Sequence, residues 1–442
     1  MEVVDSRRQL REIFQAGVEA VDPARAVSRM VQRQGDAVVV GGKTFRLEDD
    51  DRVLLVGAGK AAAPMAQALE QILGDRLTSG RITVKDGHLC PLNKVEIAEA
   101  GHPTPDQRGI ESTRRILELL EQAGERDLVF CVISGGGSAL LVSPAEGIGL
   151  AEKQAVTREL LSCGATISEI NALRKHLSRV KGGQLARWAW PATVVTLILS
   201  DVVGDPLDVI ASGPTVPDRS TFEDCWRIVQ RFGLACRIPQ AAIDTLKKGR
   251  AGALPETPKQ GDEIFRRVTN EIVGNNFLAV QEAARKASDL GYRPLILSTR
   301  MEGETREVAR VHAAIFREVR ATGHPVAPPV CILSGGETTV TLRGKGKGGR
   351  NQEFSLAVAL DIQGQEGIHF LSAGTDGTDG STDAAGAFCD GHTVERGREL
   401  RMEAMNYLEG NNSYPFFEDT GELLKTGPTN TNVMDLQICL IP

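Results

Sequence analysis

A loop of three consecutive glycines has the residue types that bind phosphate or carboxylate groups. It follows an apolar run, and its members are Ser134, Gly135, Gly136, Gly137 and Ser138. Because glycine has no Cβ, successive backbone N–H groups can approach an oxyanion closely, and the two hydroxyls add hydrogen-bond donors. The sequence therefore predicts an anion-binding loop, with a loop that only shapes the backbone as the alternative.

Lys60 lies in a glycine-containing turn, Gly57–Ala62, that follows an apolar run and opens a predicted helix. Gly57, Gly59 and Ala62 match the dinucleotide fingerprint G-x-G-x-x-G/A, but the acidic residue that should hold a ribose is poorly placed. Helix N-termini favour anions, and the Lys60 ammonium would add to that field. We expect an anion site here, with a nicotinamide site or a simple packing turn as alternatives.

Arg350 follows another glycine-rich segment, Gly344–Gly349, in which glycines alternate with Lys345 and Lys347. A loop of this composition can close over phosphate groups, and a guanidinium offers a planar pair of donors to a phosphoryl group. The segment therefore predicts a second phosphate-binding loop, and a flexible surface hairpin is the alternative.

Two carboxylates follow the apolar run Thr193–Leu199, in the segment SDVVGD. A magnesium ion takes one or two carboxylates together with phosphate oxygens, so Asp201 and Asp205 are candidate ligands for Mg²⁺. Aspartate is also common in tight turns, and that alternative stays open for both residues.

Two polar loops in the C-terminal part are candidates for binding a nucleotide or a metal. One is a Ser-Gly-Gly segment that echoes the loop around Gly135, and the other is a run of Gly, Thr and Asp without the spacing of an EF-hand. The candidate residues are Gly335, Gly336, Glu337, Asp376 and Asp379. A solvated turn is the alternative for the acidic run.

Apolar runs that alternate with helical periodicity must position these loops. The clearest predicted strands are Val53–Val56, Arg81–Lys85, Leu128–Ile133 and Thr193–Leu199. Unbroken apolar strands separated by helices are typical of a parallel sheet covered on both faces. Ligands bind such sheets beyond the carboxyl ends of the strands, which is where the loops containing Lys60 and Gly135 fall.

The segment 247–262 has two prolines, three glycines and no periodicity, which is typical of a linker. The strand and helix patterns resume after it, with a predicted strand at Thr338–Leu342 among others. We therefore expect two α/β domains, residues 1–246 and residues 263–442.

Composition excludes several classes of protein. The 442 residues carry a net charge of −7, which disfavours a general affinity for nucleic acid. Apolar stretches fall short of the roughly 18 residues that a membrane span needs. The eight cysteines form no C-x-x-C pair, as expected of reduced core residues. We expect a cytoplasmic protein with small-molecule ligands and no nucleic-acid or membrane partner; a homo-oligomer stays open.

Several segments together resemble the class II glycerate 2-kinases, which carry a C-terminal MOFRL domain. They extend from residue 56 to residue 437 and read VGAGKAA, GHPTPD, ISGGGSALL, INALRKHLSRVKGGQLA, LSDVVGDPLDVIASGPTVPD, SGGETTVTLRGKGKGGRNQE, SAGTDGTDGSTDAAGA and GPTNTNVMDL. The resemblance implies transfer of the γ-phosphoryl group of ATP to the 2-hydroxyl of D-glycerate with Mg²⁺. It also implies two non-similar α/β domains, the first Rossmann-like, with the active site in the cleft between them.

The catalytic positions of that family correspond to Lys60, Asp201 and Arg350. The resemblance implies that Lys60 and Arg350 contact the moving phosphoryl group or the glycerate carboxylate. Asp201 would orient or deprotonate the glycerate hydroxyl, or hold Mg²⁺.

Two other functions compete with this hypothesis. An NAD(P)-dependent hydroxypyruvate reductase is favoured by the glycine fingerprint around Gly59 and disfavoured by the poorly placed ribose acceptor. A non-catalytic nucleotide-binding regulator is disfavoured by the charged loops.

Overall fold

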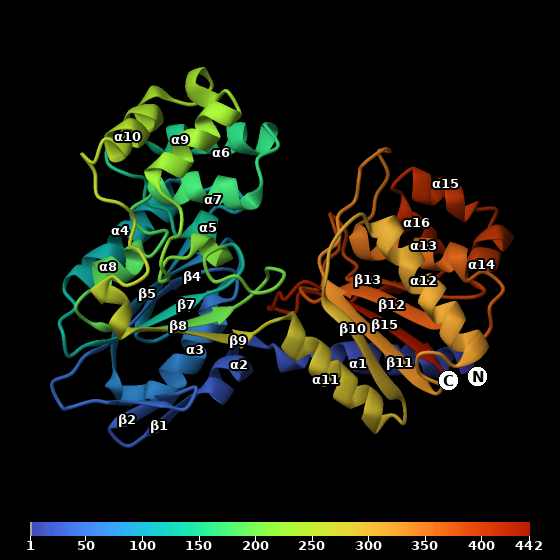
Figure 1. Ribbon diagram of the computed structural model, residues 1–442. Coiled ribbons are helices and arrows are strands. Elements are labelled where there is room, and N and C mark those ends of the chain that lie inside the picture. The colour runs from blue at the N-terminus through green and yellow to red at the C-terminus, as the bar shows by residue number, and fades with distance from the viewer. Residues whose placement is uncertain (1) are drawn as a thin grey trace. The chain divides into compact units, whose positions relative to one another are not determined.

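The computed structural model describes the backbone of residues 2–442 and the side chains of residues 5–442. The chain folds into two compact units, each built around its own sheet (Figure 1). The N-terminal unit comprises residues 23–200 and 205–273, and the C-terminal unit comprises the chain up to Asp22, residues 201–204 and residues 274–442. Two α/β units confirm the predicted fold class.

The boundaries of these units differ from the predicted domains 1–246 and 263–442. Helix α1 (Glu2–Ala20) packs against α11 (Asn276–Asp289), so the start of the chain belongs with its end. Strand β9 (Val268–Gly274) completes the first sheet. The N-terminal unit therefore extends to residue 273, beyond the predicted domain end at residue 246. The predicted linker consequently lies inside the N-terminal unit. Local composition could not show these long-range packing contacts.

The N-terminal unit contains a six-stranded sheet with the order β6-β5-β4-β7-β8-β9. The strands are β4 (Val53–Ala58), β5 (Leu77–Lys85), β6 (Val95–Ala100), β7 (Leu128–Ile133), β8 (Thr193–Leu199) and β9. The ladders that join β6, β5, β4, β7 and β8 are all parallel. This is the strand order of a Rossmann sheet, whose topological switch point lies between β4 and β7.

Helices and a small antiparallel sheet complete the N-terminal unit. The small sheet is a hairpin of β2 (Ala37–Val40) and β3 (Lys43–Arg46), which β1 (Val31–Gln34) extends. The helices are α2 (Pro23–Met30), α3 (Ala62–Leu73), α4 (Gln107–Glu121), α5 (Gly137–Leu140), α6 (Leu150–Ser162), α7 (Ile167–His176), α8 (Gln184–Ala189), α9 (Phe222–Arg231) and α10 (Gln240–Arg250).

The C-terminal unit contains a mixed six-stranded sheet with the order β10-β11-β15-β12-β13-β14. Its strands are β10 (Arg293–Met301), β11 (Val330–Gly336), β12 (His369–Gly374), β13 (Gly386–Asp390), β14 (Leu423–Leu424) and β15 (Asp435–Ile441). Only β10 and β11 pair in parallel, and β15 runs antiparallel between β11 and β12. The predicted strand Thr338–Leu342 is wrong: Thr339 makes one isolated bridge to Glu304.

Helices cover both faces of this second sheet (Figure 1). Figure 1 shows α12 and α13 on one face and α1 and α11 on the other. The helices other than α1 and α11 are α12 (Thr305–Thr322), α13 (Arg350–Asp361), α14 (Thr393–Glu399), α15 (Ala404–Glu409) and α16 (Ser413–Asp419).

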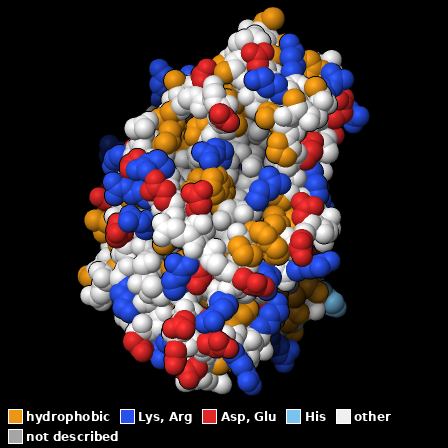
Figure 2. All heavy atoms as spheres, turned by 90° about the vertical axis from the view of Figure 1, so that its left-hand side faces the viewer, with side chains coloured by type: hydrophobic (Ala, Val, Ile, Leu, Met, Phe, Trp, Pro, Cys, Tyr) orange, Lys and Arg blue, Asp and Glu red, His pale blue; other side chains and the backbone are white. Residues whose placement is uncertain are grey.

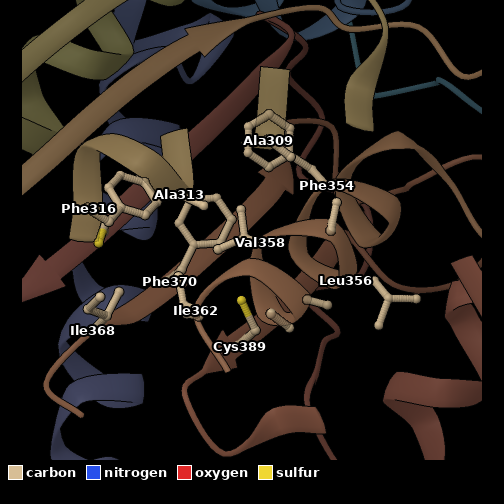
Figure 3. Packing of buried hydrophobic residues seen from close by; sticks show 14 of the residues in the cluster. Ala309, Ala313, Phe316, Phe354, Leu356, Val358, Ile362, Ile368, Phe370 and Cys389 are labelled. Carbon is tan, nitrogen blue, oxygen red and sulfur yellow. The ribbon is translucent and has the colours of Figure 1, made fainter. Parts of the chain in front are cut away.

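Aromatic packing anchors α13 onto the sheet. Phe354 of α13 stacks on Phe370 of β12, with ring centroids 5.6 Å apart, and Phe316 of α12 packs against Phe370 at 5.5 Å (Figure 3). All three rings are buried, and such pairs add to the free energy gained from burial. These contacts hold α13, which begins at Arg350, against the sheet.

The distribution of surface charge and the polarity of the helices agree with what the composition predicts. Figure 2 shows one face of the molecule, on which acidic and basic side chains are interspersed. Among the described residues, every helix is too short or too polar to cross a lipid bilayer.

Candidate active site

Hydrogen bonds join the loops after β4 and β7 at the switch point of the N-terminal sheet. Ala61 N–H donates to Ser134 Oγ at 2.9 Å, and Lys60 N–H donates to Gly135 O at 2.9 Å. Gly59 has a φ of 146°, and a Cβ there would lie 2.1 Å from Ser134 Oγ. Glycine is therefore required at this position, and the buried Ser134 hydroxyl ties the two loops together.

The Ser134–Ser138 loop keeps two backbone donors for a ligand. Within residues 2–442, the N–H groups of Gly135 and Gly136 donate to no protein acceptor, whereas Gly137 N–H donates to Ser134 O at 3.1 Å. Gly136 has a φ of 84°, which a side chain rarely adopts. Two successive unsatisfied N–H groups are the arrangement that an anion-binding loop needs.

Lys60 is half-buried and lies next to two histidines. His88 Nδ1 donates a hydrogen bond to Lys60 O at 3.0 Å. Burial, followed by the positive charge of Lys60, lowers the pKa of His102 to about 4. Burial also lowers the pKa of His88 below its ordinary value. Both imidazoles are therefore neutral near pH 7. Of these three neighbouring side chains, Lys60 is the one that can offer a positive charge to an anion.

The two predicted magnesium ligands follow β8 and belong to different units. Residues 201–204 group with the C-terminal unit, and Asp205 groups with the N-terminal unit. Asp201 and Asp205 are half-buried, and Asp205 has a φ of 57°, which indicates a tight turn. Among the described residues, no three or more His, Cys, Asp or Glu side chains cluster as a metal site would require. Metal binding by either aspartate stays a prediction.

Arg350 opens α13, and two carboxylates hold its guanidinium. Nε donates to Asp435 Oδ2 at 2.5 Å, Nη2 donates to Asp435 Oδ1 at 3.0 Å, and Nη1 donates to Glu337 Oε1 at 2.6 Å. Burial alone would lower the pKa of Arg350, but the charges of Asp435 and Glu337 raise it overall. Asp435 was not among the predicted site residues, although an aspartate that opens the apolar run of β15 was a usable signal.

Gly335 and Gly336 lie at the end of β11, within the sheet. A Cβ on Gly335 would lie 2.0 Å from Asn276 Oδ1, and one on Gly336 would lie 2.2 Å from Met301 O. The Asn276 amide donates to the backbone oxygen of Asp435 at 2.9 Å. Gly335 thus makes room for the side chain that fixes Asp435, and Gly336 makes room for the backbone of β10. A direct contact of either glycine with a cofactor stays a prediction.

A cavity of about 690 Å³ lies beside Arg350 in the C-terminal unit. This volume is in the range of small-molecule sites. Its walls are the glycine-rich loop before Arg350, the segment after β11 and the acidic loop after β12. The charged and amide side chains that line it are Glu337, Arg350, Glu353, Asp376, Asp379 and Asn411. Four of the predicted site residues are therefore brought together around one cavity.

The two predicted aspartates of this cavity have different local roles. Asp376 Oδ1 accepts hydrogen bonds from Thr378 N–H at 3.0 Å and Thr378 Oγ1 at 3.1 Å. Asp379 is 2 % exposed and accepts from Asn351 N–H at 3.1 Å and Gln352 N–H at 2.8 Å, so it caps α13. Burial raises the pKa of Asp379 to about 7, despite these helix donors.

Two asparagines hold the glycine-rich loop, Gly344–Gly349. Gly344 N–H donates to Asn411 Oδ1 at 2.9 Å, and Lys347 N–H donates to Asn412 Oδ1 at 2.9 Å. The loop is therefore packed on the segment that precedes α16 and is not a free surface hairpin. Contacts between residues more than sixty positions apart could not be predicted from the sequence.

Comparison with known proteins places both units in described families. Residues 9–247 match a domain of unknown function (DUF4147), and residues 330–435 match the MOFRL family. A D-glycerate 2-kinase of Thermotoga maritima is 43% identical, with 97% of each chain covered. A protein of Agrobacterium vitis named as a candidate hydroxypyruvate reductase is also 43% identical, over 99% of this chain and 95% of its own. The crystal structure of a Thermotoga maritima glycerate kinase superposes with a TM-score of 0.88 at 42% identity, covering 98% of this chain and 99% of that one.

Proposed function

The chain belongs to the family of glycerate kinases that combine the DUF4147 and MOFRL domains, and we propose that it transfers the γ-phosphoryl group of ATP to the 2-hydroxyl of D-glycerate. The products are 2-phospho-D-glycerate and ADP. The observation that carries the proposal is the setting of Lys60 and Arg350. Each cation adjoins the N-terminus of a helix beside a glycine-rich loop, which is the arrangement that phosphoryl transfer uses.

A protein catalyses phosphoryl transfer mainly by positioning the reactants and stabilising charge, and not by forming covalent bonds to them. In the N-terminal unit, the Lys60 ammonium and the N–H groups of Gly135 and Gly136 can bind oxyanions. In the C-terminal unit, the Arg350 guanidinium can exchange its single bond to Glu337 for a phosphoryl oxygen while Asp435 keeps it oriented through two bonds. Each unit therefore contains a cation that can bind an oxyanion.

Magnesium fits the donor set of this chain. Mg²⁺ prefers hard oxygen ligands and needs only one or two carboxylates in addition to phosphate oxygens. Asp201 and Asp205 are half-buried carboxylates that could hold it, and it would neutralise charge on the phosphate groups of ATP. Asp201 could instead orient or deprotonate the glycerate hydroxyl.

A cytoplasmic location is part of the proposal. All eight cysteines are free, and five of them are buried, as expected of thiols that act as core residues in a reducing compartment.

Hydroxypyruvate reduction is the second candidate, because some relatives carry that name. The Rossmann strand order would suit a nicotinamide nucleotide, but the residues at the end of β5 do not. β5 ends at Lys85, and the carboxylate of the following Asp86 accepts two bonds from Arg108, at 2.6 and 2.9 Å. No acidic side chain is thus presented to a ribose at the end of this strand, within the part of the chain described.

A phosphorus NMR spectrum of the purified protein with ATP, Mg²⁺ and D-glycerate tests the proposal. We expect a 2-phosphoglycerate resonance that grows together with ADP, and no such growth in Lys60→Ala. A 3-phosphoglycerate signal would contradict the position of transfer. Oxidation of NADH with hydroxypyruvate, in the absence of any kinase product, would favour the reductase.

A further inference from the structure

Two buried lysines and a half-buried arginine lie in one region of the N-terminal unit. Lys153 lies on α6 and Arg174 on α7, two helices that pack against each other, and Lys181 follows α7. Lys153 is 7 % exposed, Lys181 is 1 % exposed, and Arg174 is half-buried. Buried lysines are rare in proteins unless they have a partner, so this group needs an explanation.

Lys181 connects this group to the glycine loop after β7. Its ammonium donates to Ser138 O at 2.8 Å and lies 3.1 Å from Ser138 Oγ. The Ser138 hydroxyl is also 3.1 Å from Ser212 Oγ, which in turn donates to Asn171 Oδ1. Lys181 therefore adjoins the loop whose Gly135 and Gly136 N–H groups have no protein acceptor within the described chain.

The fold supplies carboxylates to neighbouring basic side chains but not to these three. Lys175 Nζ lies 3.2 Å from Asp218 Oδ1, and His176 Nε2 lies 3.0 Å from Glu256 Oε2. Both belong to the same helix as Arg174. Across residues 5–442, Lys153, Arg174 and Lys181 have no ion pair with a carboxylate within 4.0 Å. Carboxylates in this region therefore pair with Lys175 and His176 and leave the other three basic side chains without an acidic partner among the described residues.

Buried positive charge without a counter-charge destabilises a folded protein. Burial, followed by the charge of Arg174, lowers the pKa of Lys153 to about 8. Burial, followed by the charge of Lys153, also lowers the pKa of Lys181 well below its ordinary value. An anionic ligand would relieve this cost by supplying the negative charge that the chain omits.

We propose that Lys153, Arg174 and Lys181 form, with the Ser138 end of the glycine loop, a subsite that binds one oxyanion group of a small acid. The nature of that acid rests on the proposed function: the group is the carboxylate of the hydroxy acid or a phosphate of the nucleotide. The planar carboxylate and the tetrahedral phosphate both present negatively charged oxygens, which a guanidinium and two ammonium groups can bind.

Ligand binding measured without turnover tests the subsite. We would titrate D-glycerate, ATP without metal, and inorganic phosphate separately into the wild type, Lys153→Met and Arg174→Gln, by calorimetry and thermal unfolding. Lys248→Met, on the exposed face of α10, is the matched control. Loss of one charged hydrogen bond should weaken binding about tenfold to a hundredfold in the two variants and leave Lys248→Met unchanged.

A second readout separates ligand binding from a structural role. Methionine keeps the apolar length of Lys153 but removes the uncompensated charge, so Lys153→Met without ligand should unfold at the same or a higher temperature. A lower temperature, together with unchanged affinity for all three probes, would overturn the proposal.

The three probes distinguish the source of the oxyanion. Weakened binding of D-glycerate alone assigns the subsite to the carboxylate, and weakened binding of ATP and phosphate assigns it to the nucleotide. If the wild type binds phosphate through these residues but does not bind D-glycerate, the subsite stands and the proposed substrate fails. If the wild type binds none of the probes, the subsite itself is refuted.

Discussion

The glycine loop of the N-terminal unit, Ser134–Ser138, adjoins cations that lack carboxylate partners, whereas the loop of the C-terminal unit, Gly344–Gly349, leads into an arginine that two carboxylates already hold. Lys181 reaches Ser138, and the Gly135 and Gly136 N–H groups have no protein acceptor within the described chain. In the other unit, the Arg350 guanidinium makes three hydrogen bonds to the carboxylates of Asp435 and Glu337.

This difference separates two ways of preparing a phosphate site. An anion that enters the first loop gains attraction to charges that the protein leaves uncompensated. A phosphoryl group at Arg350 must first replace Glu337, whose side chain is 44% exposed, while Asp435, 1% exposed, stays in place. The first loop is therefore suited to hold a ligand in the ground state, and Arg350 is suited to respond to charge that develops during transfer.

Removing either cation should have the largest effect. We expect Lys60→Ala and Arg350→Ala each to lower kcat by at least about 10², or roughly 3 kcal/mol of transition-state stabilisation. If the comparison is correct, Lys60→Ala should also raise KM, whereas Arg350→Ala should act mainly on kcat. Steady-state kinetics with Lys248→Met as control measures both, and wild-type rates in the two variants would remove these residues from the site.

The partners of Arg350 offer a sharper test. Asp435→Asn leaves the guanidinium without its buried counter-charge, so we expect a loss of about 2 kcal/mol in unfolding free energy and about a tenfold lower kcat. Glu337→Gln removes a half-exposed partner that phosphate is proposed to displace, and it should change stability little. Urea unfolding and kinetics of both variants measure this. A larger loss in Glu337→Gln would reverse the proposed order of the two carboxylates.

Residue types and short-range spacing were enough to predict one unit and part of the other. In the N-terminal unit, apolar runs such as Val53–Val56 and Leu128–Ile133 became adjacent parallel strands, and the polar loops fell at their ends. In the C-terminal unit, β15 lies in the middle of the sheet although it is formed by residues 435–441, near the end of the chain. Pairing across a hundred residues has no local signature, so its position could not be predicted.

The same reason explains which site residues were found. Lys60 and Arg350 stand beside glycine loops in the sequence, and their chemistry is evident from type and spacing. Asp435 reaches Arg350 only because β15 pairs with β11 in a register that sets Gly336 opposite Asp435. Lys153 was missed because a lysine in a helix usually lies on a solvated face, and only the fold shows that it is buried.

The hydrogen bonds that hold the two glycine loops should contribute differently to the free energy of unfolding. Asn411→Ala removes the acceptor of the Arg343 and Gly344 N–H groups, at 2.7 and 2.9 Å, so we expect a loss of about 2 kcal/mol in unfolding free energy. Ser134→Ala removes one acceptor, that of Ala61 N–H, and should cost about 1 kcal/mol. Chemical denaturation of both variants measures the two losses in unfolding free energy. Equal losses would show that the number of these hydrogen bonds does not set the stability of the loops.

The smallest effect concerns the cap of α13 and depends on pH. Because the pKa of Asp379 is raised to about 7 in the folded protein, the folded state binds this proton more tightly than the unfolded state does. The stabilisation is present at low pH and is lost as pH rises toward and through 7. Asp379→Asn should remove this component, so between pH 6 and pH 7 the wild type should lose about 1 kcal/mol more than the variant.

Unfolding free energies at the two pH values test this expectation, since an amide at position 379 can still accept a bond from the helix. The control is Asp376→Asn, which alters an aspartate of the same cavity whose carboxylate accepts two hydrogen bonds from Thr378 of its own turn. Equal pH dependence in the wild type and in Asp379→Asn would mean that the Asn351 and Gln352 donors hold this carboxylate ionised. Asp379 would then add a permanent negative charge beside Arg350, and the C-terminal loop would differ even more from the cationic loop of the N-terminal unit.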